Sequence, residues 1–228
     1  MIYLLFDIDG TLLLTGGAGR AAMMQVMEEM FGQRDLPRLP VHGRTDRAII
    51  EDLFREMGLQ LNDGVYREFT SRYHQRLPET MQAGRGYLLP GVTDVLEELA
   101  AIDQVACGLL TGNSDVAARI KTAHFGIDHH FRFGGYGGAH PQREMVAREA
   151  LADCRRQLAP RTVEASRVWV VGDTIADVRC ARAIEANVIA VTTGGDTREQ
   201  LEQAGADLVM DDLSDSRPLL AICQTALS

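Results

Sequence analysis

The chain has 228 residues, of which 46% are hydrophobic and 24% are charged. These values describe an ordinary soluble globular protein, long enough to bury one α/β core with an insertion. The net charge of −9 argues against nucleic acid or a membrane as a partner, and no apolar stretch is long enough to span a bilayer. An anionic substrate would therefore need a local cation and local basic groups.

The start of the chain lacks the basic segment of a signal peptide. The four cysteines are scattered without metal-ligand spacing, at Cys107, Cys154, Cys180 and Cys223. We therefore expect free thiols, a reducing compartment and a cytoplasmic location.

The first element is the apolar run Ile2–Phe6, which predicts a short buried strand. Asp7 and Asp9 follow it, and Gly10 ends the strand in a turn. Ligands of open α/β sheets bind at such strand ends. Two carboxylates two residues apart lie on one side of an extended chain. They repel each other, attract a cation and can take separate nucleophile and acid–base roles.

The gap of roughly a hundred residues before the next strand is too long for a crossover and predicts an inserted subdomain. Helical patterns occupy 23–30, 49–57 and 65–73. We place a helical cap at 16–87 and an α/β core at 1–15 and 88–228. Glycine-rich stretches flank the insert, and they fit either a hinge or passive loops.

The segment 42–47 lies between two helical patterns of the insert. Its basic groups, Arg44 among them, could bind the anionic tail of a substrate. The same segment could instead be a solvated loop in which Thr45 caps the next helix. Both interpretations stay open.

Further apolar runs at 105–110, 168–171, 188–191 and 208–210 alternate mostly with helical patterns. This alternation predicts a Rossmann-like parallel sheet flanked by helices. The segment around His129-His130 is expected to be a loop.

Thr111, Gly112 and Asn113 follow the second strand. A hydroxyl, a glycine and a helix start together suit an anion, which the backbone N–H groups and helix dipole would attract, although the same residues also form good turns and caps. The run Gly172-Asp173-Thr174-x-x-Asp177 follows the strand predicted at 168–171. We expect Asp173 and Asp177 to face one pocket at i, i+4 and to bind Mg²⁺. Asp173 and Thr174 could also cap the helix, and the two interpretations are compatible.

The motif Asp7-x-Asp9-Gly-Thr, with Thr111 and the Asp173/Asp177 run in this order, resembles the haloacid dehalogenase-like (HAD) superfamily, whose members are mostly phosphatases. The runs at 15–20 and 43–46 look like phosphoglycolate phosphatase-type members, which carry a helical cap.

The resemblance implies that Asp7 is a nucleophile and Asp9 an acid–base. It also implies that Asp7, the Asp9 carbonyl and Asp173 hold Mg²⁺, with Asp177 nearby, and that Thr111, Gly112 and Asn113 bind phosphate.

The sequence departs from the family where a lysine usually precedes the fourth motif. We expect Arg143 to take its place, because arginine can bind phosphate through two N–H groups. Lys121 is the second candidate, but we expect its helix to carry it away from the strand end.

These features predict a Mg²⁺-dependent phosphatase acting on a small phosphomonoester, phosphoglycolate-like or a sugar phosphate, through an aspartyl-phosphate. The alternatives are a sugar-phosphate mutase, a metal-independent dehalogenase and a non-catalytic binding module. The expected partner is a small phosphorylated metabolite, and the chain is expected to be a monomer or homodimer.

Overall fold

A parallel sheet forms the centre of the protein in the computed structural model, which describes residues 1–225. The strands are β1 Ile2–Phe6, β2 Leu13–Leu14, β3 Tyr87–Leu88, β4 Val105–Thr111, β5 Phe131–Tyr136, β6 Val168–Gly172, β7 Asn187–Val191 and β8 Leu208–Met210. The helices are α1 Ala18–Phe31, α2 Asp46–Glu56, α3 Asp63–Ala83, α4 Val92–Ala100, α5 Asp115–His124, α6 Arg143–Gln157, α7 Ile175–Ala183, α8 Arg198–Gln203 and α9 Arg217–Thr225.

The main sheet has the strand order β5-β4-β1-β6-β7-β8, and all of its pairings are parallel. The predicted α/β, Rossmann-like fold is confirmed, with the five apolar runs forming β1, β4, β6, β7 and β8. Strand β5 was not predicted, because two glycines and an arginine interrupt its apolar pattern. It lies at the edge of the sheet, where a strand has one neighbouring strand and fewer of its side chains need to be apolar.

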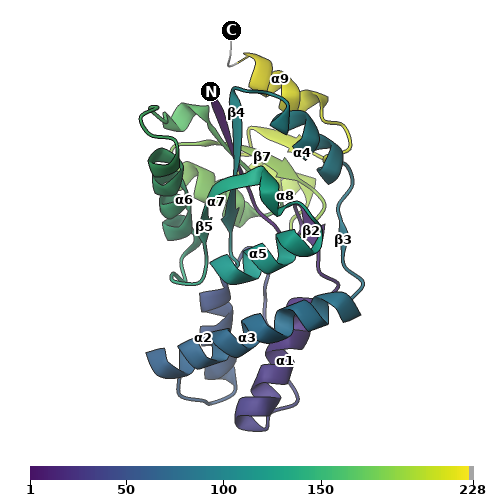
Figure 1. Cartoon of the computed structure of the whole chain (residues 1–228), viewed down its shortest axis with the longest axis vertical. Coiled ribbons are helices and arrows are strands. Elements are labelled where there is room, and N and C mark those ends of the chain that lie inside the picture. The colour runs from purple at the N-terminus through teal and green to yellow at the C-terminus, as the bar shows by residue number, and fades with distance from the viewer. Residues whose placement is uncertain (226–228) are drawn as a thin grey trace.

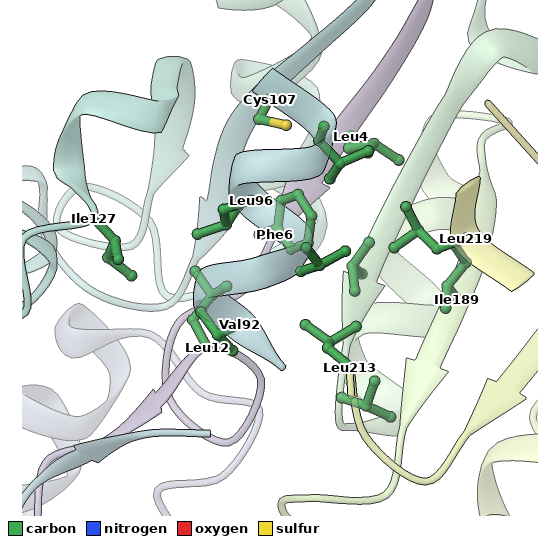
Figure 2. Packing of buried hydrophobic residues seen from close by; sticks show 14 of the residues in the cluster. Leu4, Phe6, Leu12, Val92, Leu96, Cys107, Ile127, Ile189, Leu213 and Leu219 are labelled. Atoms are coloured by element: carbon green, nitrogen blue, oxygen red, sulfur yellow. The ribbon is translucent and has the colours of Figure 1, made fainter. Parts of the chain in front are cut away.

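The side chains of β1 alternate between the two faces of the sheet, as the pleat requires. Leu4 and Phe6 pack with α4 and α9 on one face, where Figure 2 shows Phe6 close to Leu96 of α4. Tyr3 and Leu5 pack with α6 and α7 on the other. Helices therefore cover both faces, which explains why β1 is a continuous apolar run.

The helices α1, α2 and α3 form a separate layer at the lower end of the molecule in Figure 1. Their shared core includes Phe54 and Phe69, whose rings meet edge to face at 5.4 Å. The helices occupy residues 18–83, within the segment predicted as the cap, and the exact division at 16 and 87 stays a prediction. The chain enters and leaves this layer through the antiparallel pair β2 and β3.

Within residues 1–225, no helix combines the length and apolar character needed to cross a membrane.

A test of the core packing comes from two glycines with left-handed backbones, Gly91 before α4 (φ 77°) and Gly126 after α5 (φ 72°). A Cβ at Gly91 would lie 2.1 Å from the carbonyl oxygen of Leu213, whereas a Cβ at Gly126 would meet nothing within 4 Å. Gly126→Ala should therefore cost only the left-handed strain, about 1–2 kcal/mol of unfolding free energy. Gly91→Ala should cost clearly more in denaturant unfolding, and equal losses would contradict this packing.

Candidate active site

Three strand ends meet at one edge of the sheet. Strand β1 lies between β4 and β6, with Phe6 opposite both Leu109 and Val171. Asp7 follows β1, Thr111 ends β4 and Asp173 follows β6. The parallel register therefore brings Asp7 together with two side chains that are each more than a hundred positions away in the sequence.

A buried acidic cluster occupies this edge. Asp7, Asp173 and Asp177 each offer a carboxylate oxygen, and these oxygens lie within 4.8 Å of one another. Asp173 accepts hydrogen bonds from the Thr11 hydroxyl (3.0 Å) and from the Gly195 N–H (2.8 Å). Burial raises the pKa of Asp7, opposed by Arg143, and burial together with Asp177 and Asp7 raises the pKa of Asp173.

Three buried carboxylates share the one positive charge of Arg143, so the cluster holds excess negative charge when all three are ionised. A divalent cation with oxygen ligands would relieve that excess, so the residues present fit Mg²⁺. Asp173 accepts from neutral donors, whereas one oxygen of Asp177 accepts from the positively charged guanidinium of Arg143. Asp173 is therefore better suited than Asp177 to hold the cation beside Asp7.

Asp177 is placed differently from what we expected. Helix α7 begins at Ile175, so Asp173 precedes the helix and the two residues do not form an i, i+4 pair on it. One oxygen of Asp177 accepts from the N–H and hydroxyl of Thr174 at the helix N-terminus, in a capping box. The capping role therefore belongs to Asp177 with Thr174, while its role as a metal ligand stays a prediction.

Arg143 is the first residue of α6 and only 6% exposed. Its guanidinium donates to Asp177 at 2.5 Å and lies 3.3 Å from Asp7. Its Nε is buried without a hydrogen-bond partner among the described residues. An unpaired buried donor is costly, so an acceptor such as a phosphate oxygen is the natural complement.

Lys121 corrects our expectation. We predicted that α5 would carry it away from the strand end, but its ammonium donates to both oxygens of Asp9 (2.8 and 2.7 Å) and to Asn113 (2.6 Å). Helical side chains tilt toward the helix N-terminus, and α5 begins at the end of β4, so the long side chain reaches back into the site. Arg143 and Lys121 are therefore both present rather than alternatives. Lys121 is also the only lysine of the chain, a signal that the sequence offered.

Asn113 links the two sides of the site. Its side-chain N–H₂ donates to Asp9 (2.7 Å) and to the Thr111 hydroxyl (2.8 Å), and its carbonyl accepts from Lys121. Thr111 is fully buried. The predicted phosphate-binding loop thus lies beside Asp9, and its role in binding phosphate stays a prediction.

The cap contacts this loop directly. The backbone carbonyl of Arg44 lies so close to Gly112 that a Cβ there would approach it to 1.9 Å. Asp46 of α2 accepts from the Ser114 N–H (2.8 Å), a contact that the sequence did not reveal because the two residues are 68 positions apart. Thr45 caps α2, as one of our two interpretations expected, and the Arg44 guanidinium pairs with Asp52.

A cavity of about 830 Å³ lies between the cap and the core. The lining includes five polar residues of the core and also Arg44 of the cap; the core residues are Asp7, Asp9, Asn113, Lys121 and Arg143. The site residues predicted at 7, 9, 44, 112, 113 and 143 therefore all border one space.

The model of the haloacid dehalogenase-like hydrolase family matches residues 4–182. The chain belongs to this family. No curated protein matched it in a sequence comparison.

Several solved structures of this fold are similar. A protein described as a "predicted phosphoglycolate phosphatase", from Haemophilus somnus 129pt, aligns with a TM-score of 0.72 and 18% identity over 96% of this chain and 98% of that one. A predicted β-phosphoglucomutase from Thermotoga maritima aligns with a TM-score of 0.64 and 18% identity over 97% of this chain and 99% of that one. CbbY from Rhodobacter sphaeroides, in complex with xylulose-(1,5)bisphosphate, aligns with a TM-score of 0.69 and 20% identity over 94% of this chain and 96% of that one. At these identities the likeness shows the shared fold.

Metal binding at this HAD site can be tested without any substrate. Mg²⁺ at a hundred times its dissociation constant should stabilise the native protein by about 2.7 kcal/mol, seen as a rise in melting temperature. Asp173→Asn should remove this rise, because it removes a carboxylate from the buried cluster. Asp103→Asn, an exposed site at the opposite end of β4, is the matched control. A rise that survives in Asp173→Asn would move the metal elsewhere.

Proposed function

We propose that this chain is a Mg²⁺-dependent phosphomonoesterase that works through an aspartyl-phosphate on Asp7. The observation that carries the proposal is that two carboxylates, those of Asp7 and Asp9, each lie beside a buried basic side chain at one cavity. Arg143 lies against Asp7, and Lys121 holds Asp9. Membership of the hydrolase family and the phosphatase-like names among the similar structures support it.

In the first step, an Asp7 oxygen bonds to phosphorus while the bond from phosphorus to the leaving oxygen breaks. Asp9 gives its proton to that oxygen, so that an alcohol leaves. Burial keeps water away from Asp7, and Arg143 beside it favours the ionised form that attacks.

In the second step, water attacks phosphorus and gives its proton to Asp9, which releases inorganic phosphate and restores Asp7. Asn113 and Lys121 hold the Asp9 carboxylate in place. The unpaired Nε of Arg143, the N–H groups after Thr111 and the Thr111 hydroxyl would bind the phosphate oxygens.

Mg²⁺, held by Asp7, Asp173 and the carbonyl of Asp9, would neutralise phosphate charge and let an anionic nucleophile approach.

A sugar-phosphate mutase remains the second candidate, because one similar structure is that of a predicted phosphoglucomutase. A mutase would pass the phosphoryl group to a second hydroxyl rather than to water. Phosphoglycolate and sugar phosphates are therefore the first substrates to test, with release of inorganic phosphate separated from transfer.

A hydrolysis screen of phosphomonoesters tests the proposal. We expect inorganic phosphate with Mg²⁺, loss of activity with excess chelator, and weaker rescue by Ca²⁺, which prefers more ligands and looser geometry. Full activity in chelator would favour the metal-independent mechanism of a dehalogenase. No release from any ester would favour a binding module.

Asp7→Asn should abolish turnover, because an amide oxygen is a poor nucleophile, while the fold should persist. Neutralising one member of a crowded acidic cluster should also raise the melting temperature of the metal-free protein. Steady-state rates and thermal unfolding of the same preparation measure both effects. A variant that keeps a substantial fraction of the wild-type kcat would contradict the assignment of the nucleophile.

Lys121→Ala and Arg143→Ala should each lower kcat/KM by roughly 10²-fold, the scale of losing one preorganised charge. Arg119 provides the matched control, because it lies on the same helix as Lys121 but is exposed and pairs with Asp115 in a surface contact. Arg119→Ala should change kcat/KM by less than about twofold, since such exposed pairs contribute little. An unchanged kcat/KM in Lys121→Ala would mean that Asp9 functions without the hydrogen bonds from Lys121.

A further inference from the structure

The cavity between core and cap has two chemically different ends. The core end carries the charged and amide groups around Asp7 and Asp9. The cap end is formed by α1, α2, α3 and the segment 32–45, which lie below the sheet in Figure 1. The apolar side chains lining the cap end include Met23, Leu36, Leu39, Ile49 and Leu53, and they lie beside the phenol of Tyr73 and the carboxylate of Asp46.

Two of the four basic residues in the cap's part of the lining, Arg20 and Arg44, are already engaged within the protein. Arg20 donates to the backbone carbonyls of Leu36 (2.8 Å) and Pro37 (3.0 Å), so it holds the segment that forms one wall. Arg44 is paired with Asp52. The other basic residues of the lining, Arg38 and His42, are exposed at its edge.

This lining favours one type of substrate over another. The hydroxyls of a sugar would lose water against Leu39 and Ile49 without gaining hydrogen bonds, which costs free energy. A hydrocarbon body would instead cover these side chains and remove apolar surface from water.

The size of the cavity agrees with its lining. Cavities of roughly 300–1,000 Å³ enclose drug-sized ligands. The two carbons of phosphoglycolate beyond its phosphate would occupy only a small part of about 830 Å³ and would not reach the cap end.

We infer that the substrate of this enzyme is a phosphomonoester with a sizeable apolar body, which the cap end binds through Leu39, Ile49 and their neighbours. The inference rests on the proposed phosphatase function and names its substrate class. The phosphate lies at the core end and the hydrocarbon body extends between α1, α2 and the segment 32–45.

A homologous series of n-alkyl phosphates, from ethyl to hexyl, tests this inference with nearly constant leaving-group chemistry. Each buried methylene should raise kcat/KM about fourfold until the cavity is filled. Phosphoglycolate and glucose 6-phosphate serve as polar comparisons and should have lower kcat/KM values than hexyl phosphate.

The outcomes separate the two proposals. If the series is flat, or the polar esters have the higher kcat/KM, the apolar-substrate inference is wrong while the phosphatase proposal stands. If none of these esters is hydrolysed with Mg²⁺, the phosphatase proposal itself is wrong.

Variants then locate the binding surface. Ile49→Thr keeps the branching at Cβ but replaces the ethyl arm by a hydroxyl, and it should reduce the hexyl-to-ethyl ratio of kcat/KM by about fivefold or more. Leu39→Asn, in the segment outside the helices, is the second variant should Ile49→Thr not fold. Met24→Thr on α1, exposed and outside the cavity lining, is the control and should leave the ratio unchanged. An unchanged ratio in both folded cavity variants would overturn the inference.

Discussion

The balance of charge at the end of the central strands is the constraint on which the rest of the structure depends. Asp7, Asp173 and Asp177 share a buried space in which they cannot all be ionised without compensation. Arg143 reaches Asp7 and Asp177 at once, because a planar guanidinium can serve two carboxylates. Lys121 serves Asp9 instead. Its ammonium has three donors, and three acceptors lie within hydrogen-bond distance: the two Asp9 oxygens and the Asn113 carbonyl. The only lysine of the chain thus stands where a compact charge with three donors fits.

The sequence predicted those parts of the fold that depend on local patterns. Continuous apolar runs identified β1, β4 and β6, because both faces of their sheet are covered. Helix α1 ends at Gly32, which has the left-handed backbone typical of a helix end. Strand β5 escaped prediction, because Gly134 and Gly135 break its pattern and the edge position demands less of it. The pairing of β1 with β6 brings Asp173 beside Asp7. No local pattern predicted this pairing, which was expected only because the sheet was expected to be parallel.

Contacts across long distances in the chain could not be predicted in the same way. Asp46 belongs to the cap, yet its carboxylate accepts from the N–H of Ser114, at the start of α5 in the core. No local pattern links these two residues. The placement of Lys121 also depended on more than its helix, because the direction and length of the side chain decide whether it reaches the strand end. The position of Lys121 on its helix was therefore insufficient to predict whether its side chain reaches the site. That it is the only lysine in an arginine-rich chain is a feature of the sequence that marks it out.

Several polar groups of the cap make contacts within the protein, and this affects which side chains face the cavity. Asp46 docks α2 on the core, and Arg20 fastens the segment 32–45 to α1 through two backbone carbonyls. Once these groups are used for assembly, the surface that remains toward the cavity is supplied by Leu39, Ile49 and similar side chains. The core can therefore provide phosphate chemistry that is general to the family, because its residues address only the phosphoryl group. Selection among phosphomonoesters then falls to the cap, where discrimination depends on how much apolar surface a leaving group can cover.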